Sequence, residues 1–420
     1  MHNNTFCIAV LGAGNIGSAV LARLKELDNK ILNIEIKKVL VKDKSKDREI
    51  EEEILTNNFE EILNDDSIDL VIEVLGGVDP GKGYIESLLS KGKAVITANK
   101  DIIADSGPEL IKLAQENNTC LYFEAAVAAG IPVLKPLIES LRGEELTRVL
   151  GIINGTSNYI LTSMEEGSTY EDALSTAQEL GYAEPDPTND VDGIDAKFKA
   201  MILSLLCFGV SPNNEAVFTE GISKITKEDF EWASRLDKTI KLVAQIDKNN
   251  EGLNARVHPV LIDKKHPLAS IRGALNAVVV EGVNINQLVF SGPGAGSEPT
   301  ASSIIGDVLS ACRHLSSNQS NWYPLRDYKG DSKSFENVKS SMFIRLSVKD
   351  QPGVLAKISG TFGENNVSIE SVIQEGRGET AELVIITHDA KEENLSTSVE
   401  TIRALSVVDD IDSIIRVYSG

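Results

Sequence analysis

The sequence predicts an α/β protein with three units: a doubly wound parallel sheet, a larger α+β unit and a small α+β sandwich at the C-terminus. Strand-like and helical stretches alternate over roughly the first 130 residues, as they do in parallel sheets. The order then becomes irregular, and roughly the last 80 residues follow a βαββαβ pattern. A length of 420 residues agrees with two or three domains.

Composition and charge restrict the kinds of partner. Hydrophobic residues make up 42% of the chain and charged residues 25%, which is typical of a globular protein. Lys and Arg number 41 against 63 Asp and Glu, so the net charge of −22 argues against nucleic acid and anionic membranes. The sequence shows no signal peptide, no apolar run of about 20 residues and no paired spacing of its four cysteines. We therefore expect a cytoplasmic protein with reduced thiols.

The first unit begins with a short apolar strand, Phe6–Leu11, that leads into a glycine-rich loop and an amphipathic helix. In the loop, Gly12 permits a tight turn, Gly14 lets the backbone approach a pyrophosphate, and Gly17 lets the helix pack closely. Free N–H groups at the helix start can bind phosphates. This context predicts a Rossmann-like dinucleotide-binding site, and a purely structural turn is the alternative. The expected cofactor contacts here are Gly12, Gly14, Asn15, Ile16 and Gly17.

Two later segments of this unit carry further candidate cofactor contacts. Lys42 and its basic neighbours outnumber Asp43, which favours the 2′-phosphate of NADP over the ribose of NAD, although a solvated turn is the alternative. Thr97, Asn99 and Lys100 end an apolar strand, at the edge where parallel sheets bind ligands. The expected strands are Ile34–Val41, Ile68–Leu75, Ala94–Thr97 and Thr119–Glu124, and the expected helices are Pro80–Ser90 and Pro108–Asn117.

The middle unit, expected over 131–320, mixes helices and strands, which suits an α+β substrate-binding domain. We expect a helix near 300–315 to return to the first unit, which spans 1–130, and a polar linker at 321–341. A polar, acidic stretch, Ser211–Asp237, shows no clear element. The expected elements are a strand at Arg148–Asn154, helices at Asp172–Leu180 and Ile194–Phe208, and a strand with a turn at Ala277–Phe290.

The densest polar cluster lies at 181–199, where two prolines stiffen a loop rich in carboxylates. Asp195 and Lys199 are four residues apart at the start of an apolar helix, so they share one face and can pair. A lysine held among carboxylates can protonate a carbonyl oxygen, and an acid in the loop can bind an ammonium group. The alternative is a capped helix with a solvated acidic start.

The C-terminal unit, 342–420, is predicted to be a ferredoxin-like sandwich. Gly353 lies at the start of its first helix, where no side chain obstructs a ligand and free N–H groups favour a carboxylate. The expected strands are Phe343–Val348, Val367–Gln374, Ala381–Thr387 and Ile414–Tyr418, and the expected helices are Pro352–Glu364 and Leu395–Leu405.

Six motifs are spread over about residues 6–320. They are GAGNIG at 12–17, EVLGG at 73–77, TANK at 97–100, NGTSNYIL at 154–161, GYAEPDPTNDVDGIDAKFK at 181–199 and SGPGAGSEPTASSIIGD at 291–307. In order and spacing these motifs resemble those of homoserine dehydrogenases, the segment at 181–199 most distinctively. The resemblance implies reversible hydride transfer between L-aspartate 4-semialdehyde and L-homoserine, with NADP or NAD, in threonine, methionine and isoleucine biosynthesis.

The same resemblance implies roles for individual residues. Lys199 matches the family's proton-donating lysine, and Lys100 matches a second active-site lysine that also contacts the cofactor. Glu184 matches the acid that holds the substrate amino group, with Asp190 and Asp195 as further carboxylates. The remaining matches are Asn154, Gly155 and Thr156 in a substrate loop, and Gly294 and Gly296 on the cofactor side.

A sodium site is also implied by the resemblance. The segment at 123–131 is similar to the family's sodium-binding loop, in which backbone carbonyls bind the ion. Carbonyl oxygens suit a hard cation, but they leave no side-chain signature. The matched residues are Glu124, Val127, Ala129 and Ile131.

The C-terminal unit resembles an ACT domain, a module that usually pairs with a second copy and binds an amino acid. The resemblance implies a free amino-acid effector, with threonine as the natural candidate. It also implies a homodimer or homotetramer in which the middle unit, 131–320, mediates dimerisation, because this unit and the ACT unit both tend to self-associate in relatives. A dimerisation module without a ligand is the alternative. The matched effector residues are Asp350, Pro352, Gly353, Val354, Leu355, Asn365 and Ile369.

Two other functional classes fit the sequence less well. A phosphorylating aldehyde dehydrogenase needs a nucleophilic cysteine in a polar site, and Cys120 and Cys207 lie in apolar stretches. A non-catalytic sensor that joins a nucleotide-binding domain to a regulatory module would not need the cluster at 181–199. An oxidoreductase that uses lysine as its acid is therefore the expected function.

Overall fold

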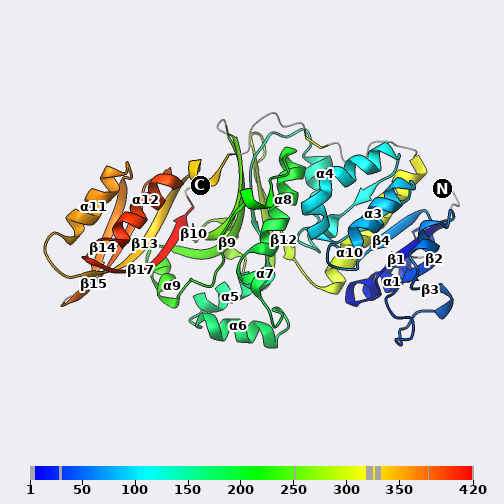
Figure 1. Ribbon diagram of the computed structural model, residues 1–420, viewed down its shortest axis with the longest axis horizontal. Coiled ribbons are helices and arrows are strands. Elements are labelled where there is room, and N and C mark those ends of the chain that lie inside the picture. The colour runs from blue at the N-terminus through cyan, green and yellow to red at the C-terminus, as the bar shows by residue number, and fades with distance from the viewer. Residues whose placement is uncertain are drawn as a thin grey trace.

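The computed structural model describes residues 5–27, 31–249, 252–317, 325–326, 333–376 and 378–418. The molecule is elongated, with the N-terminal unit at one end, a broad sheet in the middle and the C-terminal unit at the other end (Figure 1). Among the described residues, no helix is both long enough and apolar enough to cross a bilayer.

The first unit is a six-stranded parallel sheet in the order β3-β2-β1-β4-β5-β6, which confirms the predicted doubly wound, Rossmann-like fold. Its central strands consist mostly of buried apolar residues, as expected for a sheet covered on both faces. The strands are β1 (Thr5–Leu11), β2 (Asn33–Leu40), β3 (Leu55–Thr56), β4 (Leu70–Glu73), β5 (Ala94–Thr97) and β6 (Leu121–Tyr122), and the helices are α1 (Asn15–Leu27), α2 (Glu60–Leu63), α3 (Gly81–Ser90) and α4 (Lys100–Glu116).

Helices α4 and α10 shape the edge of this unit. The sequence predicted a helix from Pro108, but α4 already begins at Lys100 and carries Pro108 in its interior. The Asn99 side chain caps α4 by accepting the Ile102 N–H at 3.3 Å, so the capping residue and not the proline marks the start. Helix α10 (Ser297–Ser317) returns to pack on α1, where Glu298 pairs with Arg23 at 3.1 Å.

The middle and C-terminal units share one sheet, in the order β12-β11-β7-β9-β10-β17-β13-β15-β14. Strands β10 and β17 join the two units as a parallel pair, with Val260 opposite Arg416 and Leu261 opposite Val417. The middle strands are β7 (Leu146–Ile152), β8 (Phe218–Thr219), β9 (Lys238–Asn249), β10 (Gly252–Asp263), β11 (Leu275–Gly282) and β12 (Asn286–Pro293). The C-terminal strands are β13 (Lys339–Lys349), β14 (Ile369–Glu375), β15 (Thr380–Thr387), β16 (Ala390–Lys391) and β17 (Val408–Val417).

The helices of the middle unit place the polar cluster next to the first unit. Helix α8 has the predicted bounds, and it packs on β9 and β10 on one side and on α4 on the other. Its N-terminal turn carries Asp195 and Lys199 to the boundary between the two units. The helices are α5 (Gly155–Glu165), α6 (Tyr170–Glu179), α7 (Thr188–Val191), α8 (Ile194–Phe208) and α9 (Lys227–Arg235), with a π-turn at Pro136–Ser140.

The C-terminal unit confirms the predicted ferredoxin-like sandwich, with α11 (Val354–Glu364) and α12 (Glu392–Arg403) joined to the strands by a buried apolar cluster. The short β16 is an addition to the predicted order. Residues 321–324 and 327–332 of the segment expected as a linker, 321–341, lie outside the described residues, and β13 already begins within the segment at Lys339. The domain boundaries therefore stay a prediction.

Candidate active site

A cavity of about 1010 Å³ lies where the first and middle units meet. It gathers residues from the start of α4, the starts of α5 and α8, the loop around α7, and the segments before β11 and α10. Predicted site residues on this wall are Lys100, Asn154, Gly155, Thr156, Glu184, Asp190, Asp195, Lys199, Gly294 and Gly296. Segments about 200 residues apart in the sequence thus share one cavity.

Asp195 lies between two lysines at the centre of this wall. Its Oδ2 accepts a hydrogen bond from Lys199 Nζ at 2.6 Å, and its Oδ1 lies 3.3 Å from Lys100 Nζ. Lys199 Nζ also donates to the carbonyl oxygen of Ile153 at 2.8 Å. One carboxylate therefore holds two ammonium groups close together at the cavity surface.

Asn154 connects this trio to a second acid. Its amide Nδ2 donates to Asp190 Oδ1 at 2.7 Å and to Asp195 Oδ2 at 3.0 Å. Its Oδ1 accepts the N–H of Ser157 at 2.8 Å and so caps α5. The same residue therefore begins a helix and orients two carboxylates.

Burial and neighbouring charges set the protonation of these groups. Burial alone would raise the pKa of Asp195, but the ammonium groups of Lys199 and Lys100 outweigh it, and the pKa is lowered. Burial disfavours the charged form of Lys100, but Asp195 and Asp101 outweigh it and raise the pKa of that lysine. Burial raises the pKa of Asp190. The centre therefore combines a firmly ionised acid with a firmly charged lysine.

Lys100 is held at the carboxyl edge of the parallel sheet by the residues before it. Thr97 Oγ1 donates to the buried carboxylate of Glu73 at 2.5 Å and accepts the N–H of Asn99 at 3.0 Å. Asn99 Nδ2 in turn donates to the carbonyl oxygen of Gly77 at 2.6 Å. Thr97 and Asn99 do not line the cavity, so the structure gives them a part in fixing the loop before Lys100.

The glycine-rich turn after β1 fits a dinucleotide. A Cβ on Gly17 would lie 2.2 Å from the carbonyl oxygen of Gly12, so only glycine allows α1 to pack this closely. Gly12 has a φ of +108°, which favours glycine, and a Cβ on Gly14 would meet open space. Asn15 and Ile16 are the first residues of α1, at the same sheet edge as Lys100. A compact turn with an open face at a helix start suits a pyrophosphate.

The other predicted cofactor residues lie on either side of this turn. Lys42 is exposed after β2, where the Asp43 carboxylate accepts bonds from the Ser45 N–H at 2.9 Å and the Ser45 hydroxyl at 2.7 Å. Gly294 and Gly296 line the cavity just before α10, which packs on α1. The turn itself and Lys42 are not part of the cavity wall.

The predicted cation loop lies behind the cavity, between β6 and the π-turn. Glu124 is buried, and its carboxylate accepts the N–H groups of Val133, Leu134 and Lys135 at 2.7 to 2.9 Å. The Ala129 carbonyl accepts the hydroxyl of Ser303 at 2.5 Å. Ala128 and Ala129 have positive φ, which turns the backbone in this loop. Val127 and Ile131 are also buried there, and among the described residues no cluster of three His, Cys, Asp or Glu resembles a metal site.

Sequence reasoning missed one wall of the cavity. Arg272, Gly273, Ala274 and Leu275 line it, together with Tyr182, Phe198 and Asp101. The segment around Gly273 joins a 3₁₀ turn to β11, and the positive φ of Gly273 marks a tight turn there. A short loop of mixed residues has no periodicity from which a site could be inferred.

The predicted effector residues lie in the C-terminal unit, away from the cavity. Gly353, with a φ of +91°, is the capping residue before α11, which begins with Val354 and the exposed Leu355. Asp350 accepts the Gly378 N–H at 3.3 Å, and Asn365 ends the helix. Pro352 precedes this helix start, and Ile369 begins β14.

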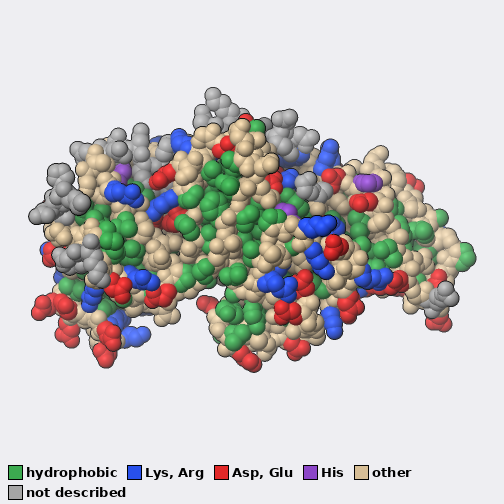
Figure 2. Space-filling model, turned by 180° about the vertical axis from the view of Figure 1, so that it is seen from behind, with side chains coloured by type: hydrophobic (Ala, Val, Ile, Leu, Met, Phe, Trp, Pro, Cys, Tyr) green, Lys and Arg blue, Asp and Glu red, His purple; other side chains and the backbone are tan. Residues whose placement is uncertain are grey.

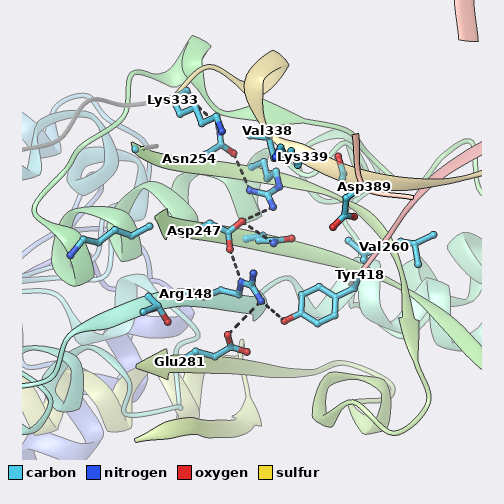
Figure 3. Close-up of a pocket in the computed structure, with 17 residues that line it drawn as sticks. Arg148, Asp247, Asn254, Val260, Glu281, Lys333, Val338, Lys339, Asp389 and Tyr418 are labelled. Atoms are coloured by element: carbon cyan, nitrogen blue, oxygen red, sulfur yellow. Dashed lines mark hydrogen bonds and ion pairs between the residues drawn. The ribbon is translucent and has the colours of Figure 1, made fainter. Parts of the chain in front are cut away.

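A second cavity, of about 550 Å³, lies between the middle sheet and the C-terminal unit (Figure 3). Asp247 bridges two arginines there, Arg148 at 2.7 Å and Arg256 at 2.6 Å. Arg148 also donates to the Tyr418 hydroxyl at 3.0 Å and lies 3.5 Å from Glu281. The four charged residues all lie on strands of the middle unit, and only the Tyr418 hydroxyl reaches them from the C-terminal unit, so we interpret the cavity as lined by an internal ionic cluster of the middle sheet.

The parallel sheet with its glycine-rich turn, beside a cavity that holds two lysines and an acid, defines the class: a nicotinamide-dinucleotide-dependent oxidoreductase. Three family models match the chain: "Homoserine dehydrogenase, NAD binding domain" at residues 12–124, "Homoserine dehydrogenase" at 132–309 and "ACT domain" at 342–407. The chain is 39% identical to a homoserine dehydrogenase of Bacillus subtilis, over 98% of both chains. The chain therefore belongs to the homoserine dehydrogenase family.

Solved structures agree with this assignment. A homoserine dehydrogenase from Thiobacillus denitrificans matches with a TM-score of 0.93 and 34% identity, over 99% of this chain and 98% of that one. A hyperthermophilic archaeal homoserine dehydrogenase in complex with NADPH matches with a TM-score of 0.64 and 28% identity, over 74% of this chain and 98% of that one. The protein is thus an NAD(P)-dependent homoserine dehydrogenase with a C-terminal ACT domain.

The alternative of a cysteine-dependent aldehyde dehydrogenase lacks support in the structure. Burial raises the pKa of Cys207 to about 12, which argues against a role of its thiol as a nucleophile.

Proposed function

We propose that Lys199 donates the proton to the carbonyl oxygen of L-aspartate 4-semialdehyde as the alcohol forms. The observation that carries this proposal is the Lys100–Asp195–Lys199 trio on the cavity wall. Asp195 orients both ammonium groups, and Lys100 places positive charge beside the oxygen that becomes negative. The bound nicotinamide supplies the hydride to the carbonyl carbon. In the reverse direction Lys199 takes the proton back from the alcohol.

The amino and carboxylate ends of the substrate are assigned to the rest of the wall. Glu184 is exposed to the cavity and is suited to an ammonium group, and Asp190 lies behind it, bound to Asn154. Gly155 and Thr156 begin α5, so their region offers free N–H groups to a carboxylate. These positions fit a small amino acid that is charged at both ends.

We propose NADP as the preferred cofactor. The Asp43 carboxylate is engaged by Ser45, and Lys42 and Lys44 are exposed beside it, so the turn after β2 favours a phosphate over a ribose hydroxyl. We expect a kcat/KM for NADPH at least about tenfold above that for NADH, in line with one or two charge-assisted contacts. Lys42→Ala should lower the value for NADPH more than that for NADH. Initial rates measured at 340 nm with both cofactors check this, and an enzyme that prefers NADH contradicts it.

We also propose that threonine inhibits the enzyme through the ACT domain. Two arginines of this domain reach the middle unit: Arg345 lies 3.1 Å from Asp229 of α9, and Arg416 lies 2.7 Å from Glu220. Ile222 lies two residues after Glu220, and its N–H donates to the carbonyl oxygen of Val191 at 2.8 Å. Val191 directly follows Asp190, which lines the cavity. Bonded contacts therefore connect the ACT sheet with the cavity wall.

An effector site at the start of α11 predicts a specific loss of inhibition. Asp350 would bind the ammonium group of threonine and the helix start its carboxylate. We expect Asp350→Ala to raise the threonine concentration for half-inhibition by about tenfold or more, the usual effect of losing a charged hydrogen bond. Asp409→Ala, an exposed acid in the same domain, is the control. Unchanged inhibition in Asp350→Ala, or no response of the natural chain to threonine, would overturn the assignment.

Three further proposals rest on the fold. We propose a sodium ion on the carbonyls of Glu124, Val127, Ala129 and Ile131, because the backbone turns there with two positive φ values. We propose a homodimer or homotetramer, because hydrophobic side chains gather over the middle of one face (Figure 2). In addition, Val283 and the edge-strand residues Leu288 and Val289 are exposed. The four free cysteines favour a cytoplasmic location.

A further inference from the structure

Lys241 is a buried lysine that the reaction described above does not use. It lies in β9, and its side chain is among the largest that are fully buried. Its Nζ donates to the carbonyl oxygen of Ile271 at 2.8 Å and to Asn158 Oδ1 at 3.4 Å. Burial lowers the pKa of Lys241 to about 8. Removing an amine from water is costly, so its retention at this position calls for a function.

Asn158, on α5, carries the effect of Lys241 to a backbone segment. Its Nδ2 donates to the carbonyl oxygens of Gly273 at 2.9 Å, Leu275 at 3.0 Å and Ile271 at 3.3 Å. A side-chain amide could turn over, but an ammonium group only donates and carbonyl oxygens only accept. Lys241 therefore fixes the amide with its oxygen toward the lysine and its nitrogen toward the segment.

The segment Ile271–Leu275 includes the cavity wall that sequence reasoning missed, Arg272–Leu275. It is tied to α5 at further points: the Gly273 N–H donates to Thr162 Oγ1 at 3.0 Å, and Arg272 pairs with Glu165 at 2.7 Å. A Cβ on Gly155 would lie 2.8 Å from the carbonyl oxygen of Ala274, so this wall packs directly on the start of α5. A small shift of the segment would therefore change the shape of the cavity.

The geometry points to Lys241 as a positioning residue: through Asn158 it fixes the segment Ile271–Leu275 and so sets the fit of the substrate in the cavity. This inference rests on the proposed assignment of the cavity as the reaction site. The lysine does not touch the reacting atoms. Its loss should therefore weaken substrate binding more than it slows the chemical step.

Lys241→Met tests this, because methionine fills a similar volume without a donor. We expect the KM for aspartate semialdehyde to rise about five- to tenfold while kcat stays within about threefold. A rise in KM of this size is expected when one or two hydrogen bonds are lost. Lys93→Met is the matched control: Lys93 is also buried and donates to two carbonyl oxygens, of Asp65 at 2.6 Å and Ile68 at 3.1 Å, but it does not line or border the cavity. Both variants should lose thermal stability, and only Lys241→Met should raise KM.

A double-variant cycle provides the second measurement. If Lys241 acts through Asn158, then Asn158→Leu should raise KM similarly, and the double variant should be no worse than the poorer single variant. If Lys241→Met does not fold, Lys241→Gln, which keeps a donor on a shorter stem, should show a smaller rise. An unchanged KM in the Lys241 variants, an equal rise in Lys93→Met, or additive effects in the cycle would overturn the inference. The Lys199 variants test the assignment of the reaction site separately. If they lose activity, that assignment stands whatever the Lys241 variants show.

Discussion

Lys199→Met is expected to lower kcat for semialdehyde reduction by about two to four orders of magnitude, the usual size of a lost general acid. Methionine keeps most of the volume of the lysine stem, so the helix start should stay in place. The ammonium group that donates to Asp195 at 2.6 Å disappears, and the forming alkoxide loses its nearest proton. Steady-state rates with saturating NADPH measure the effect.

Lys197→Met is the control for that experiment. Lys197 lies two residues earlier in the same helix and is half-buried, but it does not line the cavity. Its replacement should leave kcat within about threefold, as for most substitutions away from a site. If Lys199→Met kept a near-normal rate, or if Lys197→Met were the slower variant, the proton donor would have to be sought elsewhere.

Asp195→Asn is expected to lower kcat/KM by about two orders of magnitude and to change its pH dependence. Asparagine keeps the shape but removes the negative charge between Lys100 and Lys199, whose orientation depends on it. The Asp195 carboxylate raises the pKa of Lys100, so its loss lowers that pKa. Lys100 then loses its proton at lower pH, and the alkaline fall in reduction rate should begin earlier than in the natural chain.

A pH–rate profile of kcat/KM in the reduction direction checks this second prediction. Asp192→Asn is the control, because Asp192 is an exposed acid three residues away and does not line the cavity. It should leave the alkaline limb where it was. An Asp195→Asn enzyme with an unmoved limb would show that Lys100 has no part in the pH dependence.

Local patterns were enough to predict the elements that carry most of the site. The apolar run Ile194–Phe208 predicted α8 with its observed bounds. In the structure Gly193 and Gly209 flank the helix in the left-handed conformation that favours glycine. The spacing of Asp195 and Lys199 then predicted their pairing, since residues four apart share a helix face. The residues of other segments that contact this pair could be predicted only from the family resemblance.

Other parts depended on contacts between distant segments. Strands β9 and β10 went unpredicted because lysines and a proline interrupt their apolar pattern, and they form a hairpin that the rest of the sheet stabilises. Helix α9 lies in the acidic stretch that showed no element, and its capping box of Thr226 and Asp229 was the signal available there. The wall at Ile271–Leu275 is shaped by Asn158 and Lys241, which lie more than 29 residues away in the chain, so no local pattern could reveal it.

The pairing of β10 with β17 has a consequence for how the chain denatures. The main apolar cluster contains Phe343 and Ile415 of the ACT domain together with Val149 and Ile246 of the middle unit, so the interiors of the two parts are continuous, although the ACT domain also has a smaller apolar cluster of its own. Unfolding of one part would remove backbone hydrogen-bond partners from the other part along the β10–β17 pair and would expose apolar side chains of the shared cluster. We therefore expect a chain cut ahead of β13 to aggregate through its unpaired sheet edge, and not to form a smaller working catalyst.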